Sequence, residues 1–139
     1  MAVTVKRPRI VVSKLALEGD DRGAKLIARL LRDAGVEVIY TGPEDRPEGI
    51  VETAIQEDAD AVALSILSGE HMVLVPRILE LLRAGGAGEV RVVVSGTIPA
   101  DDAAALERLG VTAVLNRGSA VERVATLLRC EASRTAPCL

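Results

Sequence analysis

Short apolar runs alternate with longer segments of helical periodicity along most of the chain. A run rich in β-branched residues is typical of a strand buried in a parallel sheet, and apolar residues at i, i+3, i+4 and i+7 are typical of a helix packed on it. That helical spacing is followed by Ile27, Leu30, Leu31 and Ala34, and Gly35 then stands where the helix should end. The pattern therefore predicts repeated β–α units.

Five strands and five helices are predicted in alternation. The strands are expected at residues 10–12, 36–40, 61–66, 90–94 and 113–115, and the helices at about 21–34, 47–58, 73–84, 99–110 and 119–128. Right-handed crossovers leave few arrangements of parallel strands. We expect one α/β domain over residues 1–130, with a flavodoxin-like, Rossmann-like, doubly wound sheet of five parallel strands in the order 2-1-3-4-5. Residues 131–139 are expected to form a flexible C-terminal tail.

Composition and charge exclude some classes of binding partner. The chain has 139 residues, a formal net charge of −3, one tyrosine (Tyr40), and neither phenylalanine nor tryptophan. Nucleobases usually stack on aromatic side chains, and nucleic acids and anionic membranes attract basic surfaces. We therefore expect no nucleic-acid or membrane partner and, without a long apolar run, a cytoplasmic protein. Cys130 and Cys138, close to the C-terminus, are expected to be free thiols.

The loops that follow the strands carry the candidate chemistry, because ligands of a doubly wound sheet bind beyond the carboxyl ends of its strands. The loop after the first strand holds Glu18, Asp20 and Asp21 just before a helix. Three carboxylates there would repel a phosphate, which argues against dinucleotides and nucleoside triphosphates. The aspartates could instead simply cap the helix.

A signal-receiver domain shares this predicted fold and also has acidic residues after the first strand. Such a domain needs a phosphoacceptor aspartate at the end of the third strand and a lysine after the fifth. Here those places hold Ser65 and Asn116-Arg117. The receiver interpretation is therefore rejected.

Small residues follow three neighbouring strands of the predicted sheet. Hydroxyl-bearing and glycine residues gather in segments 65–69, 95–99 and 116–119. Together they predict a polar-walled pocket that admits a long, neutral or singly charged group. The alternative is that the same residues serve only as helix caps and turns.

These loops resemble the cobalamin-binding domain of the methylmalonyl-CoA mutase group, which occurs as a C-terminal domain or a separate small subunit of acyl-CoA mutases. The resemblance runs from about residue 7 to residue 130. Residues 21–25 resemble the start of the family's first helix, Ser65-Ile66-Leu67 fits its S-x-L motif, and residues 95–99 stand where the family has two glycines. The residues that it implies for cobalamin binding are Glu18, Asp20, Asp21, Arg22, Gly23, Ser65, Leu67, Ser95, Gly96, Thr97 and Gly118.

The chain departs from the family in the loop after the first strand. The family carries D-x-H-x-x-G, whereas this chain has Glu18-Gly19-Asp20-Asp21-Arg22-Gly23, so Asp20 stands at the histidine position. In the family that imidazole is the lower ligand of cobalt, oriented by the preceding aspartate. A carboxylate is a hard donor that suits Mg²⁺ or Ca²⁺ better, so no metal ligand is predicted here. The cobalamin would keep its own base or lack a strong protein ligand.

His71, the one histidine of the chain, is not predicted to replace that ligand. It follows the third strand at the start of a helix, where the family also often has a histidine that does not bind cobalt. We expect it to form a hydrogen bond at the helix start or to be exposed.

Two functions remain open from the sequence. The first is a cobalamin-binding protein or small subunit of an acyl-CoA mutase-type isomerase, holding adenosylcobalamin or another form. A (β/α)₈ barrel takes roughly 250 residues, so such a protein is not catalytic alone and needs a barrel-type large subunit, or it forms a homo-oligomer. The second is a family member that no longer binds cobalamin and acts as a regulatory or assembly subunit.

Overall fold

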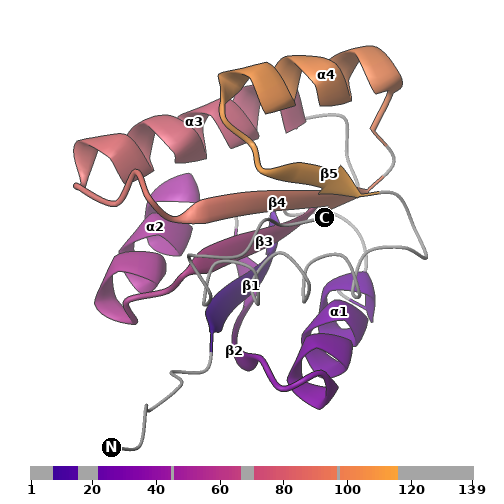
Figure 1. The fold of residues 1–139 in the computed structure, drawn as a ribbon, viewed down its shortest axis with the longest axis vertical. Coiled ribbons are helices and arrows are strands. Elements are labelled where there is room, and N and C mark those ends of the chain that lie inside the picture. The colour runs from indigo at the N-terminus through magenta and orange to yellow at the C-terminus, as the bar shows by residue number, and fades with distance from the viewer. Residues whose placement is uncertain (1–7, 16–21, 45, 67–70, 97, 116–139) are drawn as a thin grey trace, which may run out of the picture.

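The sheet has the predicted strand order. The computed structural model of the chain describes residues 8–15, 22–44, 46–66, 71–96 and 98–115. Five parallel strands lie in the order β2-β1-β3-β4-β5, as Figure 1 shows. They are β1 (Arg9–Leu15), β2 (Glu37–Glu44), β3 (Ala61–Ile66), β4 (Arg91–Gly96) and β5 (Ala113–Leu115).

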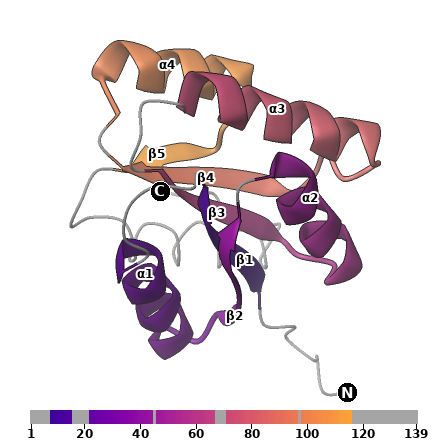
Figure 2. The same ribbon diagram turned by 180° about the vertical axis from the view of Figure 1, so that it is seen from behind.

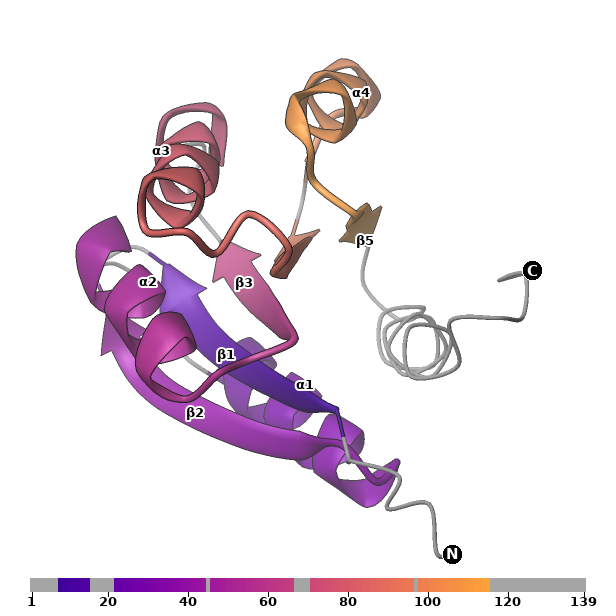
Figure 3. The ribbon, with the colours of Figure 1, turned by 60° about the vertical axis from the view of Figure 1, so that its left-hand side comes forward.

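Four helices are described, and they cover the two faces of the sheet unequally. They are α1 (Arg22–Asp33), α2 (Pro47–Gln56), α3 (His71–Ala84) and α4 (Ala100–Leu109). Helix α1 lies on one face, opposite α3 and α4 (Figures 1 and 2), and Figure 3 shows α2, α3 and α4 following one another along the other face. The predicted helix 119–128, the tail and both cysteines lie outside the described residues. No described helix is long and apolar enough to cross a membrane.

Several elements extend further than the sequence predicts. Strand β1 runs to Leu15 and β4 to Gly96, so Lys14 and Ser95, both expected in loops, are strand residues. Strand β2 runs to Glu44 past an irregularity opposite Val12 and Lys14 of β1. The reason is that backbone hydrogen bonds to a neighbouring strand hold polar residues as well as apolar ones in a ladder.

The face covered by α2, α3 and α4, here called the α3 face, is filled by large aliphatic side chains. Strand residues such as Leu64, Ile66 and Val94 meet Ile78 and Leu82 of α3 in one buried cluster. Burying a side chain of this size contributes roughly 1.5–3 kcal/mol each. This cluster is the main hydrophobic core.

The opposite face, here called the α1 face, is built from smaller side chains. Its buried cluster comprises Ile10, Val12, Ala24, Ala28, Leu31, Val36, Ala61, Ala63, Val93, Ala113 and Leu115. Alanines of α1 meet alanines of β3, so the helix lies close to the sheet there. The predicted stop of this helix is confirmed, because Gly35 has a φ of 91°.

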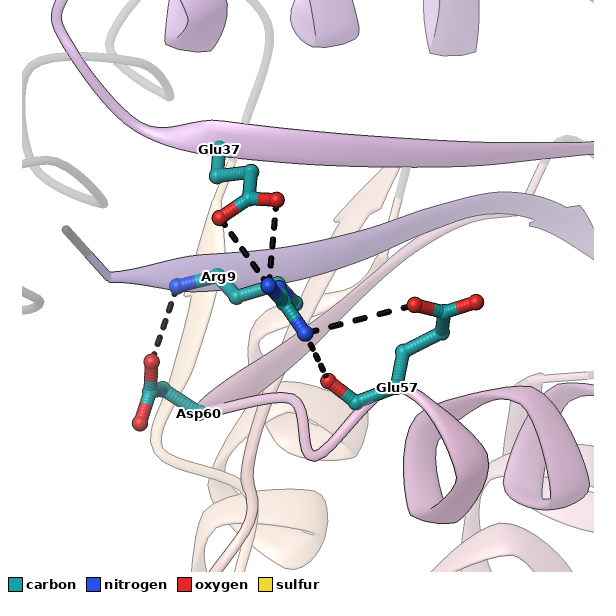
Figure 4. A network of polar contacts seen from close by, with 4 residues as sticks. All are labelled: Arg9, Glu37, Glu57 and Asp60. Atoms are coloured by element: carbon teal, nitrogen blue, oxygen red, sulfur yellow. Dashed lines mark hydrogen bonds and ion pairs between the residues drawn. The ribbon is translucent and has the colours of Figure 1, made fainter. Parts of the chain in front are cut away.

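The amino ends of the strands are joined by a polar network around Arg9 (Figure 4). The Arg9 backbone N–H donates to Oδ2 of Asp60 at 2.8 Å, and its guanidinium contacts Glu37 at 3.1 Å and the carbonyl oxygen of Glu57. These contacts connect the starts of β1 and β2 with the residue before β3. They lie at the end of the sheet opposite the predicted ligand site.

Candidate functional site

Three polar side chains form a row across the carboxyl ends of neighbouring strands. Lys14 of β1 pairs in register with Ser65 of β3, which pairs in register with Ser95 of β4. Side chains alternate along a strand, so these three follow Val12, Ala63 and Val93 on the α1 face. We call Lys14, Ser65 and Ser95 the edge row.

The two serines of the edge row combine small volume with hydrogen-bonding capacity. Ser65 is buried and Ser95 is half-buried. The Ser95 hydroxyl lies 3.5 Å from the carbonyl oxygen of Leu64, which is long for a hydroxyl hydrogen bond. The Ser95 hydroxyl can therefore turn to a ligand at little cost. The structure brings these two predicted site residues together.

Lys14 was missed by the sequence analysis as a site residue. Its side chain is only 2% exposed, although a lysine is almost never buried unless its charge is paired. Lys14 does make a polar interaction in the structure. The available signal was the alternation of β1, which places Lys14 on the same face as Ile10 and Val12. It stands two residues before segment 16–21, which contains Glu18, Asp20 and Asp21.

Gly96, another predicted site residue, is explained by the packing of the strand ends. Its φ is 151°, and a Cβ built on it would come 2.2 Å from the carbonyl oxygen of Ile66. No side chain fits there without moving the end of β3. The sheet therefore requires this glycine, whether or not a ligand approaches it.

The remaining predicted site residues are only partly covered by the structure. Arg22 and Gly23 begin α1, whose start is near the carboxyl ends of the strands. Outside the described residues lie Glu18, Asp20, Asp21, Leu67, Thr97 and Gly118. Within the described part of the chain, no group of three histidine, cysteine, aspartate or glutamate residues could hold a metal ion.

Of the two expectations for His71, the structure agrees with a hydrogen bond at the helix start and not with exposure. Its side chain is buried at the start of α3, and its partner lies on another helix. Its Nε2 lies 2.8 Å from Oδ2 of Asp102 in the first turn of α4. Sequence periodicity could not show this contact, because it joins residues that are distant in the chain.

A groove of about 440 Å³ lies elsewhere, between α1 and β2. It is lined by Lys25, Ala28, Arg29, Arg32, Asp33 and Tyr40. It shares no residue with the edge row or with the predicted site. We assign no function to it.

Comparison with known proteins covers most of the chain. A model of the B12 binding domain matches residues 8–125, which include every described strand and helix. The chain belongs to the B12-binding domain family. Cobalamin is the cofactor that the family's name specifies, as the resemblance in the loops implied.

Two relatives of this B12-binding domain are separate small subunits. The 2-hydroxyisobutanoyl-CoA mutase small subunit of Aquincola tertiaricarbonis is 49% identical over 107 residues, covering 77% of this chain and 79% of the relative. The pivalyl-CoA mutase small subunit of Xanthobacter autotrophicus is 44% identical over 116 residues, covering 84% and 78%. Both matches span most of each protein, so the sizes correspond.

A solved structure confirms the fold of the B12-binding domain. A cobalamin-binding protein from Desulfitobacterium hafniense superimposes with a TM-score of 0.69, covering 78% of this chain and 53% of that one. The sequences are 20% identical, so the likeness concerns the fold.

Proposed function

We propose that the chain is the cobalamin-binding small subunit of an acyl-CoA mutase and acts with a larger catalytic subunit. The observation that carries the proposal is the edge row, at the strand ends of a B12-binding domain. Two relatives of the chain are named as small subunits of acyl-CoA mutases, and they support the same assignment. Adenosylcobalamin supplies radical chemistry to the enzymes that bind it.

The side chains of the α1 face fit part of such a cofactor. Ala63, Ser65 and Ser95 are small, whereas Leu64, Ile66 and Val94 on the α3 face are large. A narrow polar chain placed against the α1 face would meet hydroxyl groups and little steric resistance. We infer that Ser65 and Ser95 hold the nucleotide tail of cobalamin, together with the predicted residues Gly23, Leu67 and Thr97.

Lys14 contributes a positive charge beneath the same edge. A buried ammonium is stable only with an anionic or strongly polar partner. The acidic segment that follows contains Glu18, Asp20 and Asp21. We infer that the buried Lys14 supports cofactor binding at this edge, to which the predicted residues Asp21 and Arg22 also belong.

The residue at the cobalt position does not fit cobalt well. Asp20 offers oxygen, a hard donor, where the resembling family has an imidazole nitrogen. We therefore propose that the protein holds cobalamin through the edge row and the neighbouring loops, while cobalt receives no strong ligand from Asp20. The base-on form is the expected state.

The partner is proposed to be a barrel-type large subunit that covers the carboxyl edge. Met72 and Val73, in the first turn of α3, are exposed at 36% and 72%. Apolar side chains beside a ligand site are typical of an interface. Size-exclusion chromatography with a purified barrel-type mutase subunit should give one complex, and Val73→Asp should weaken it about tenfold. Unchanged association would argue against this edge as the interface.

Cofactor binding is tested by titrating the purified chain with hydroxocobalamin and with adenosylcobalamin, followed by dialysis. We expect the corrinoid to be retained and its absorbance spectrum to show the base-on form. A chain that retains no corrinoid would contradict the proposal and favour the assembly-subunit function.

The position of Asp20 is tested separately with a matched pair of variants. Asp20→His should move the spectrum of bound cobalamin toward the histidine-ligated form, because an imidazole nitrogen becomes available. Asp20→Asn removes the carboxylate without adding that ligand and should leave the spectrum unchanged. An unchanged spectrum in both variants would mean that this loop does not approach cobalt.

A further inference from the structure

The hydrogen bond between His71 and Asp102 joins two helices at the ligand-binding end of the sheet. His71 is the first residue of α3, and Asp102 lies in the first turn of α4. The His71 side chain is 6% exposed and the Asp102 side chain 37% exposed. An ionised carboxylate can only accept, so Nε2 of His71 carries the hydrogen and donates it.

The place of this pair connects it to the edge row. Strand β3 ends at Ile66, shortly before His71, and β4 ends at Gly96, shortly before Asp102. The same strand ends carry Ser65 and Ser95. The pair therefore spans the two connections that lead from the strand ends into α3 and α4.

A second polar contact joins the same two helices at their other ends. The Arg83 guanidinium donates to the carbonyl oxygen of Leu109 at 2.8 Å, at the amino end of the sheet. Arg83 is exposed, whereas His71 is buried. Two contacts of similar length thus fix the same helix pair, but only one of them adjoins the strand ends with the serines.

We propose that His71 and Asp102 are positioning residues that hold the strand ends bearing Ser65 and Ser95 in the arrangement that receives cobalamin. This inference rests on the proposed cofactor function. Without the hydrogen bond, a buried polar ring loses its partner and the helix starts can separate. The ends of β3 and β4 would then open more often, although the rest of the core stays packed.

The first test needs no cofactor. Amide hydrogen exchange is measured at the ends of β3 and β4 in the full chain, comparing wild type with Asp102→Ala, Asp102→Asn and Arg83→Ala. We expect exchange at Ser95 and Gly96 to be about tenfold faster in Asp102→Ala. Asp102→Asn keeps an acceptor for the imidazole and should restore slow exchange. Arg83→Ala should leave these amides unchanged.

The second test measures hydroxocobalamin affinity in the same variants and in His71→Leu and His71→Gln. Asp102→Ala and His71→Leu should weaken binding about tenfold, while the two variants that retain a hydrogen bond should bind nearly as wild type. Arg83→Ala should bind as wild type even if its melting temperature falls. Asp102 is partly exposed, so its variants test the proposal even if His71→Leu does not fold.

The outcomes separate this inference from the proposed function. Unchanged exchange in Asp102→Ala would overturn the inference, whether or not the wild type binds cobalamin. Faster exchange with unchanged affinity would overturn it as well. A wild type that binds no corrinoid would refute the proposed function, whereas the exchange data would still decide whether the pair positions the strand ends.

Discussion

The α3 face and the α1 face are made by the same strands but differ in side-chain size. Large aliphatic side chains fill the α3 face, including Leu64 and Val94, whereas alanine and serine occupy the neighbouring positions Ala63, Ser65 and Ser95 on the α1 face. Larger side chains bury more apolar surface and contribute more to stability. The comparison indicates that packing on the α3 face is the main source of stability. On the α1 face, the smaller side chains near the carboxyl ends of the strands bury less apolar surface.

The largest loss of stability is expected from a substitution on the α3 face. Ile78 is fully buried in its core, so Ile78→Ala should lower the free energy of unfolding by about 2–5 kcal/mol. Chemical denaturation measures this loss. Cobalamin affinity of the folded fraction should remain that of wild type. A large loss of affinity would show that the two faces are not separable.

A smaller stability effect and a larger binding effect are expected on the α1 face. Ser65→Leu adds volume at a buried position and should cost about 1–3 kcal/mol of stability. It should also abolish corrinoid retention, because it puts a bulky apolar side chain next to Ser95, where the cofactor is proposed to bind. Ser65→Ala is the matched control and should retain cobalamin with reduced affinity. Retention by Ser65→Leu would place the cofactor elsewhere.

A substitution in the polar network at the amino ends of the strands should lower stability without disturbing the α3 face or the α1 face in particular. Asp60→Ala removes the acceptor of the Arg9 backbone N–H and should cost about 1–2 kcal/mol, measured by denaturation. Asp60→Asn keeps an acceptor oxygen and should lose less. Cobalamin affinity should not change in either variant, since the network lies opposite the edge row.

The smallest effect is expected on the pH dependence of stability. A hydrogen bond with its own backbone is the main cause of the lowered pKa of Glu48. Desolvation opposes it, and a hydrogen bond and charge from Arg77 and the charge of Arg46 lower the pKa further. A carboxyl with a lowered pKa in the folded state stabilises above its unfolded pKa, and this contribution fades as pH falls through the folded value. Glu48→Gln should therefore flatten the decline of melting temperature in the acid range. The Glu48 side chain is 41% exposed, so solvent screens its interactions and the difference should be slight.

Periodicity was sufficient for the architecture. Alternation of β-branched runs with amphipathic segments predicted the parallel sheet and its order 2-1-3-4-5, which the structure confirms. Boundaries were less accurate. Lys14 and Ser95 are polar and were assigned to loops, but their backbones extend β1 and β4 because neighbouring strands supply hydrogen bonds.

The candidate site was predictable only in part. Ser65, Ser95 and Gly96 were singled out from residue type and position, and the structure gathers them at one edge. Lys14 was overlooked, because its burial depends on packing around the strand. The contact of His71 with Asp102 was also beyond the sequence, since it joins two helices through tertiary packing.

The sequence by itself determined the fold class, the family and the small residues at the strand ends, because these follow from local periodicity and from motifs that are contiguous in the chain. Only the tertiary structure decided which side chains share a face and which groups meet across elements. Register placed Lys14, Ser65 and Ser95 in one row, and helix packing brought His71 to Asp102. Such contacts depend on relative positions in space, which no single stretch of sequence encodes.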